Sequence, residues 1–251
     1  MRILEFGNRQ KRKLLLIHGF QSPWQVWNQY IEHYKNDFHI IVPIITGHDP
    51  DKKEDFISFE DDAREIEHFI ISRYGSDIYA VFAMSMGGVL EAAIWQNKRL
   101  NIEKVIFDGS PLTSVHPILK AFMRRFYLSV THKMQKHDAK TIKQASGTII
   151  APDNLDDFIK VLDSMTDSTI VNALNGIAGF RLKTDVSTAG TRIYYFHGTA
   201  PNEMLAKKTA KFLKKHYPDT SVKCFAGKAH CENSLIYPGV MIDELNRILE
   251  G

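Results

Sequence analysis

Several features that would set the chain apart from ordinary globular proteins are missing from its 251 residues. Only two cysteines are present, Cys224 and Cys231. They lie seven positions apart with no second pair, which suits neither a disulfide framework nor a zinc site. The eleven histidines include no His-x-x-x-His pair with a nearby Glu. The sequence therefore predicts no metal centre.

Long apolar runs and a strong net charge are also absent. No apolar run approaches the roughly 18 residues that a membrane span needs, and Met1–Gly7 leads into the charged turn Asn8–Lys13 without a signal-peptide pattern. The formal net charge is only +3, which gives no general reason to expect a nucleic-acid partner. We therefore expect a cytoplasmic protein with no stable membrane insertion.

Short apolar segments alternate with helical patterns, which favours β-α-β units and an α/β fold. Several segments are apolar throughout, as are strands that helices cover on both faces. We expect a mostly parallel central sheet of about seven strands flanked by helices. The predicted strands are Ile3–Phe6, Leu14–His18, Phe38–Ile44, Ile78–Met84, Lys104–Phe107, Arg192–His197 and Ser221–Phe225, and the predicted helices among them are Phe59–Arg73, Met86–Asn97, Glu203–His216 and Pro238–Leu249.

The alternation breaks between Pro111 and Arg192, where we find no convincing strand. Apolar residues at helical spacing occur instead, for example from Ile118 to Val130. An all-helical insertion after one strand of a parallel sheet predicts a lid over the carboxyl edge, where open α/β sheets place their sites. We expect residues 1–110 and 191–251 to form the core, and residues 111–190 to form an inserted helical cap.

Charge is distributed unevenly along the chain. Residues 111–150 contain seven Lys or Arg and one acid, Asp138, whereas residues 49–67 contain nine acids and three bases. Such runs are usually solvated helix faces. The alternative is a basic cap that attracts anionic substrates or a membrane surface.

The segment Val81–Gly88 carries the most informative motif. Ala83 and Gly87 lie two positions before and two after Ser85. A serine at the tip of a tight turn from strand to helix lies in a strained backbone region, and larger side chains at those two positions would collide. The pattern predicts a nucleophile elbow, with a plain packing turn of small residues as the alternative.

Four motifs follow one another along the chain. They are His18-Gly19-Phe20 followed by two tryptophans, Thr46-Gly47-His48-Asp49, the Ser85 elbow, and Gly227-Lys228-Ala229-His230. In this order they resemble the motifs of the α/β-hydrolase superfamily, and the resemblance covers essentially the whole chain. It implies that fold, a capped serine hydrolase similar to carboxylesterases, and neither a metal nor an organic cofactor.

The resemblance assigns a role to each motif. Ser85 would be the nucleophile, and His230 the base that removes its proton, since an imidazole titrates near neutral pH. The backbone N–H groups of Phe20 and Met86 would form the oxyanion hole. His18 and His48 would brace the loop that carries Phe20.

The third member of the triad departs from the family pattern. The family usually places an Asp shortly after the strand that ends here at Gly198, and this chain has none there. Glu203 is the nearest carboxylate, and a Glu can orient an imidazole as an Asp does. One alternative is Asp108, one strand after the nucleophile, where some lipases of the superfamily keep their acid. The other is a Ser85–His230 dyad that uses neither carboxylate.

Aromatic residues near these motifs complete the prediction. They could line an acyl pocket or pack the cap onto the core. The four residues are Trp24, Trp27, Phe122 and Phe126. We expect cleavage of a small carboxylic ester or thioester through an acyl-enzyme on Ser85. The alternatives are a carbon–carbon bond hydrolase, a lyase similar to the one in menaquinone synthesis, and a non-catalytic receptor for a small molecule.

Overall fold

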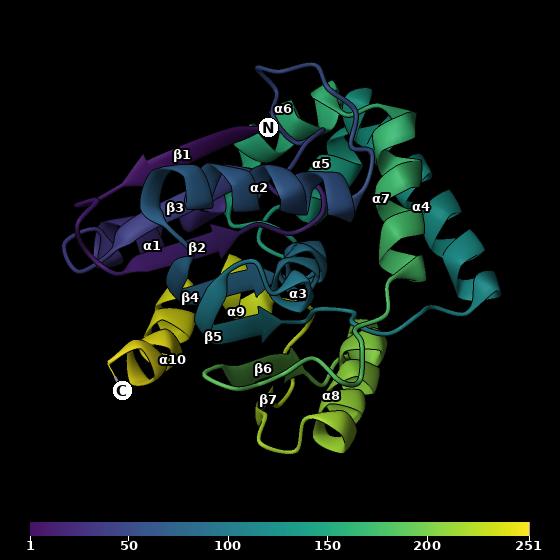
Figure 1. The fold of residues 1–251 in the computed structure, drawn as a ribbon. Coiled ribbons are helices and arrows are strands. Elements are labelled where there is room, and N and C mark those ends of the chain that lie inside the picture. The colour runs from purple at the N-terminus through teal and green to yellow at the C-terminus, as the bar shows by residue number, and fades with distance from the viewer. Residues whose placement is uncertain (251) are drawn as a thin grey trace.

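The computed structural model describes residues 1–250 and contains one seven-stranded sheet (Figure 1). The strand order is β1-β3-β2-β4-β5-β6-β7, in which β1 is antiparallel to β3 and all other neighbours are parallel. The predicted mostly parallel sheet of about seven strands is confirmed. The strands are β1 (Arg2–Phe6), β2 (Lys13–Ile17), β3 (His39–Ile44), β4 (Asp77–Met84), β5 (Asn101–Asp108), β6 (Arg192–Gly198) and β7 (Ser221–Phe225).

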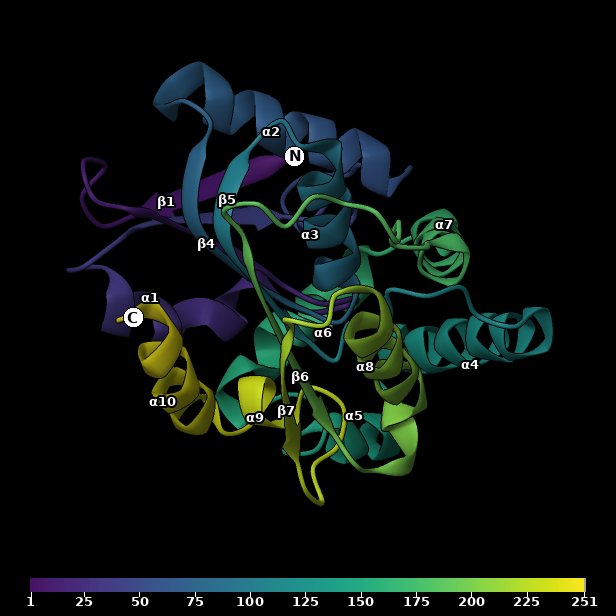
Figure 2. The same cartoon turned by 60° about the horizontal axis from the view of Figure 1, so that its bottom comes forward.

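Helices cover both faces of the sheet, which explains why its central strands are apolar throughout. All six residues of β3 are buried, as are seven of the eight in β4. Figure 2 shows α2, α3 and α8 on one side of the sheet and α1 and α10 on the other. These helices are α1 (Asn28–Tyr34), which follows the short 3-10 helix η1 (Trp24–Trp27), α2 (Phe59–Tyr74), α3 (Met86–Asn97), α8 (Met204–His216) and α10 (Pro238–Leu249).

The predicted helix ends agree closely with the structure. The side chain of Ser58 caps α2 by accepting the Asp61 N–H at 3.1 Å. Helix α3 is buried on every side over its first ten residues, Met86–Trp95. The apolar residues of α2 and α3 share one hydrophobic core with the sheet, so α3 has no open side.

The segment between β5 and β6 forms helices joined by loops, with one isolated bridge between Ser146 and Ile150. Figure 1 shows α4 and α7 beyond the carboxyl ends of β2 and β5. Among residues 1–250, no helix is both long and apolar enough to cross a membrane. The helices of the insertion are α4 (Pro117–Gln135), α5 (Ala139–Ala145), the 3-10 helix η2 (Pro152–Asn154), α6 (Leu155–Ser164) and α7 (Asp167–Gly179).

Candidate active site

Ser85 occupies a sharp turn between β4 and α3. Its backbone has φ 50° and ψ −115°, a conformation that L-residues rarely adopt. The Ser85 N–H donates to the carbonyl oxygen of Asp108 at 2.8 Å, which ties the turn to the neighbouring strand. A Cβ added to Gly87 would lie 2.4 Å from the His18 carbonyl oxygen, so the close approach of α3 to β2 requires glycine there. The turn has the backbone of a nucleophile elbow.

His230 connects the serine to a carboxylate. Its Nε2 lies 2.8 Å from the Ser85 Oγ, and its Nδ1 lies 2.5 Å from the Glu203 Oε1. The three side chains come from the carboxyl edge of the sheet: from the end of β4, from the loop after β7, and from the 3-10 helix η3 (Pro201–Glu203) after β6. The arrangement lets Nδ1–H donate to Glu203 while Nε2 accepts the serine hydroxyl proton.

The pKa shifts of His230 and Glu203 suit an imidazole base that is hydrogen-bonded to an ionised carboxylate. Burial lowers the pKa of His230, but the hydrogen bond and charge of Glu203 outweigh burial and raise the pKa above its ordinary value. Burial raises the pKa of Glu203, yet His230 and the Gly198 N–H, which donates to Oε2 at 2.7 Å, bring it below its ordinary value. The carboxylate is therefore ionised at neutral pH and favours the protonated imidazole.

Asp108 lies nearby but does not contact the imidazole nitrogens. Its carboxylate is buried and accepts a hydrogen bond from the Ser234 hydroxyl at 2.6 Å. Burial raises the pKa of Asp108 to about 6. The negative charge of Asp108 acts on His230 only through space. It also raises the pKa of His230, but by less than Glu203 does. Of the two predicted acids, Glu203 is the one that the structure brings onto the ring.

Gly109 is a site residue that the sequence analysis missed. Its φ is +63°, and a Cβ there would lie 2.8 Å from the His230 Cε1. Any side chain at this position would displace the imidazole, so the glycine creates the space for His230. The available signal was the turn sequence Asp108-Gly109-Ser110-Pro111 at the end of a strand.

Cys231 is buried and its Sγ contacts the Asp108 carbonyl oxygen at 3.4 Å.

The two residues predicted to supply the oxyanion hole lie on segments next to the serine. A Cβ added to Gly19 would be 3.5 Å from the Ser85 Cβ, which places the loop carrying Phe20 against the elbow. Met86 is the first residue of α3, where backbone N–H groups have no partner within the helix. Neither the Phe20 nor the Met86 N–H has a hydrogen-bond acceptor within residues 1–250. Both donors are therefore free for an anion.

Buried histidines brace this loop. The His18 Nε2 accepts the Ile45 N–H at 3.0 Å, which leaves Nδ1–H to donate to the Gly19 carbonyl oxygen at 2.9 Å. Burial lowers the pKa of His18 to about 4 and that of His48 to about 3, so both rings are neutral. The two rings lie against each other with centroids 5.3 Å apart. They hold backbone in place and do not face Ser85 as bases.

The four predicted pocket aromatics lie in different surroundings. Trp27 is fully buried and its ring packs edge-on against Tyr30 and Phe82, so it is a core residue rather than pocket lining. Trp24 is half-buried, stacks on Phe6, and lines a cavity of about 270 Å³ together with His48 and Lys160.

Phe122 and Phe126, the other two predicted pocket aromatics, stand on the outer surface of α4 with 65% and 50% of their areas exposed. The inward-facing aromatic of this helix is Tyr127, whose ring meets Phe20 at 5.3 Å between centroids. The structure therefore brings Tyr127, and neither phenylalanine, against the Phe20 loop. Side chains on one helix separate in this way because neighbours in sequence point about 100° apart.

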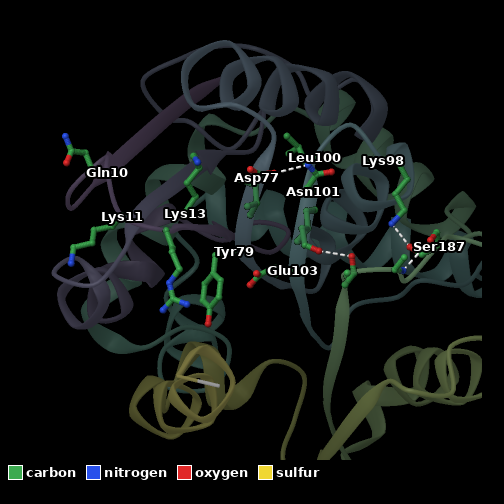
Figure 3. A pocket seen from close by; sticks show the side chains of 16 residues that line it. Gln10, Lys11, Lys13, Asp77, Tyr79, Lys98, Leu100, Asn101, Glu103 and Ser187 are labelled. Carbon is green, nitrogen blue, oxygen red and sulfur yellow. Dashed lines mark hydrogen bonds between the residues drawn. The ribbon is translucent and has the colours of Figure 1, made fainter.

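A cavity of about 840 Å³ lies away from this site (Figure 3). Its lining includes Lys13, Asp77 and Asn101, which are the first residues of β2, β4 and β5. It therefore opens at the amino edge of the sheet, opposite the edge that carries Ser85. Figure 3 shows Lys11 and Lys98 on opposite sides of the cavity, with the Lys98 ammonium donating to the Ser187 carbonyl oxygen, and the lining residues that the structure describes include no histidine.

No family model matches the chain, and no curated protein sequence matches it. Solved structures do match over nearly their full length. An alpha/beta hydrolase family protein from Desulfitobacterium hafniense is 16% identical with a TM-score of 0.78, and the match covers 99% of this chain and 100% of that one. A thermophilic esterase from Thermogutta terrifontis is 18% identical with a TM-score of 0.71, covering 100% and 94%. MenH from S. aureus is 14% identical with a TM-score of 0.72, covering 99% of each chain. Together with the strand-to-helix elbow at Ser85, these matches show that the chain has the α/β-hydrolase fold.

Proposed function

We propose that the protein is a serine hydrolase that cleaves carboxylic esters or thioesters. The observation that carries the proposal is the continuous hydrogen-bonded chain from the Ser85 Oγ through His230 to Glu203. A lone serine hydroxyl is a poor nucleophile, and a base within hydrogen-bond reach activates it. The His230 side chain remains 33% exposed, so a substrate can reach the pair from solvent.

The reaction would proceed in two halves. The Ser85 Oγ attacks the carbonyl carbon while Nε2 of His230 takes the hydroxyl proton, and Glu203 stabilises the resulting imidazolium. The imidazolium then protonates the departing alcohol or thiol, which leaves an acyl group on Ser85. Water, deprotonated by the same imidazole, attacks this acyl-enzyme and releases the acid.

The backbone donors act on the charge that forms in each half. The N–H groups of Phe20 and Met86 would hold the oxyanion, and removal of one such donor typically costs about 3 kcal/mol of transition-state stabilisation. Met86 also begins α3, whose positive end favours an anion. Side chains contribute little to this role, since backbone N–H groups supply it.

We propose residues 111–190 as the cap that shapes the substrate pocket. Helix α4 reaches the loop that carries Phe20 through the Tyr127 ring, and the Gln21 side chain donates to the Thr131 hydroxyl. A change in α4 is thereby transmitted to a backbone donor of the site. The core residues in this proposal are 1–110 and 191–251.

The alternative is a carbon–carbon bond hydrolase or a lyase on the same fold. The likeness to the S. aureus MenH structure is the observation that supports this alternative. Such reactions can use the same serine and histidine but need not form an acyl-enzyme from a simple ester. The two proposals therefore differ in whether an aryl ester gives a burst of alcohol before steady turnover.

The test is hydrolysis of p-nitrophenyl esters over a series of acyl lengths, with wild type and Ser85→Ala side by side. We expect a burst of p-nitrophenol, turnover that falls by at least about 10⁴-fold in Ser85→Ala, and labelling of Ser85 by a fluorophosphonate. Labelling without ester turnover would favour the lyase alternative. A folded protein that is neither labelled nor active would overturn the proposal in favour of a receptor.

A further inference from the structure

The outward face of α4 is apolar although it faces solvent. Ile118, Phe122 and Phe126 are spaced four residues apart, which places them in one stripe, and they are 76%, 65% and 50% exposed. The two phenylalanine rings stack, with centroids 6.3 Å apart and planes at 16°. The opposite face of the helix packs inward through Thr131 and Met134, which are buried. The stripe is therefore not needed to hold α4 on the protein.

Helix α4 is positively charged. It contains Lys120, Arg124, Arg125 and Lys133 and not one acidic residue. At about 100° per residue, Arg125 and Lys133 project from the same side of the helix as the stripe, whereas Lys120 and Arg124 do not. Neither Arg124 nor Arg125 has an ion-pair partner within residues 1–250. Helix α5 continues the positive charge with Lys140 and Lys143. An exposed apolar stripe with cations on the same side of a helix that has no acid is typical of segments that lie in the interface of an anionic lipid bilayer.

We propose that α4 docks the protein on an anionic phospholipid surface, with Ile118, Phe122 and Phe126 in the boundary between headgroups and acyl chains. Charge complementarity selects this occupant. A second copy docked through the same face would bring two helices of equal positive charge together, which costs free energy. Lipid phosphates would instead pair with Arg125 and Lys133, and the phenylalanines would leave water.

The geometry links this face to the site. Phe126 packs against Tyr127 with centroids 5.3 Å apart, and Tyr127 packs against Phe20. Figure 1 shows α4 on the outer margin of the molecule, where a flat surface can reach it without meeting the sheet. A bilayer bound there would lie on the side of the protein that carries the carboxyl edge and its site.

The experiment is sedimentation of the full chain with vesicles of phosphatidylcholine, with and without phosphatidylglycerol. We expect binding only when the anionic lipid is present, and we expect salt to weaken it. Phe122→Ser/Phe126→Ser should lower the partition coefficient by about tenfold or more, because two rings no longer enter the interface. Arg125→Glu should lower it by about tenfold or more as well.

Matched controls make the result specific to α4. Val240→Ser removes another exposed apolar side chain, 47% exposed on α10, and Lys11→Glu reverses an exposed charge in the turn between β1 and β2. Both should bind as wild type does. All variants change exposed side chains, so equal thermal midpoints would verify that they are folded. Binding that does not depend on anionic lipid, or that the α4 variants leave unchanged, overturns the proposal. A dimer in sedimentation velocity that Phe122→Ser abolishes, without vesicle binding, would assign the face to a second copy instead.

Discussion

The core and the helical insertion use their apolar residues in opposite ways. In the core, Phe82 and Trp27 are fully buried and fix the strand whose end carries Ser85. In the insertion, Phe122 and Phe126 of α4 stand in solvent. Reacting groups must be held within a fraction of an ångström, which a packed sheet can do. The exposed face of α4 needs no such support, whereas its inward residues Tyr127 and Thr131 contact the loop that carries Phe20.

The largest effect should come from the carboxylate that touches His230. Glu203→Gln keeps the shape but removes the charge, so the imidazolium formed in the reaction loses its stabilising partner. We expect kcat for an ester to fall by about 10³–10⁴-fold. Asp108→Asn should lower kcat by less than about tenfold, because Asp108 acts on the ring only through space. Steady-state kinetics on the two variants measures the contrast, and the reverse order would move the acid role to Asp108.

The next largest effect should be a difference between the core and the insertion in how much a lost ring lowers the free energy of unfolding. Phe82→Ala opens a cavity in the core, and we expect it to lower the free energy of unfolding by about 3–5 kcal/mol. Phe122→Ala removes a ring that is already exposed, so the change should stay within about 0.5 kcal/mol. Urea unfolding followed by tryptophan fluorescence checks both. A large loss in Phe122→Ala would show that the outer face of α4 is packed in solution and would remove the contrast.

The pH dependence should report the charge around His230. The base must be neutral to accept the serine proton, so kcat/KM should fall about tenfold per pH unit below the pKa of His230. That pKa is raised by Glu203 above the ordinary value of about 6.5, so the acid limb should lie above pH 6.5. Asp108→Asn removes a smaller negative contribution and should shift the limb slightly to lower pH. A limb that stays fixed in that variant would mean that Asp108 is uncharged at the pH of the limb.

Much of the fold could be predicted because its signals are local. A strand covered on both faces, such as β3, is a continuous apolar run, and the cap of α2 at Ser58 is a short motif. The elbow is equally local, because the collision that demands small residues involves positions two apart from Ser85. The choice between Glu203 and Asp108 was not local. It depends on which carboxylate the loops after β5 and β6 bring to a histidine that follows β7, and only the three-dimensional structure gives that distance.

The missed elements have the same explanation. Helix α5 is only seven residues long and buries one of them, Ala145, so no apolar stripe marked it. Trp27 and Trp24 are close in sequence, yet one enters the core and the other lines a surface cavity. The role of Gly109 follows from its contact with His230, which lies far away in the sequence.

The smallest expected effect tests whether the insertion is an independent cooperative unit. Asp138 caps α5 by accepting the Thr141 N–H at 2.9 Å. Asp138→Ala should cost about 1 kcal/mol, whereas Asp138→Asn keeps a capping oxygen and should cost little. Because α5 buries so little, we expect the loss to appear as roughly fivefold faster amide hydrogen exchange confined to α5, with the thermal midpoint nearly unchanged. Ser58→Ala removes the equivalent cap from α2, whose face is buried in the core, and should lower the midpoint itself. If Asp138→Ala lowered the midpoint as much as Ser58→Ala does, the insertion and the core would unfold as one unit, and a cap that moves separately from the site would be excluded.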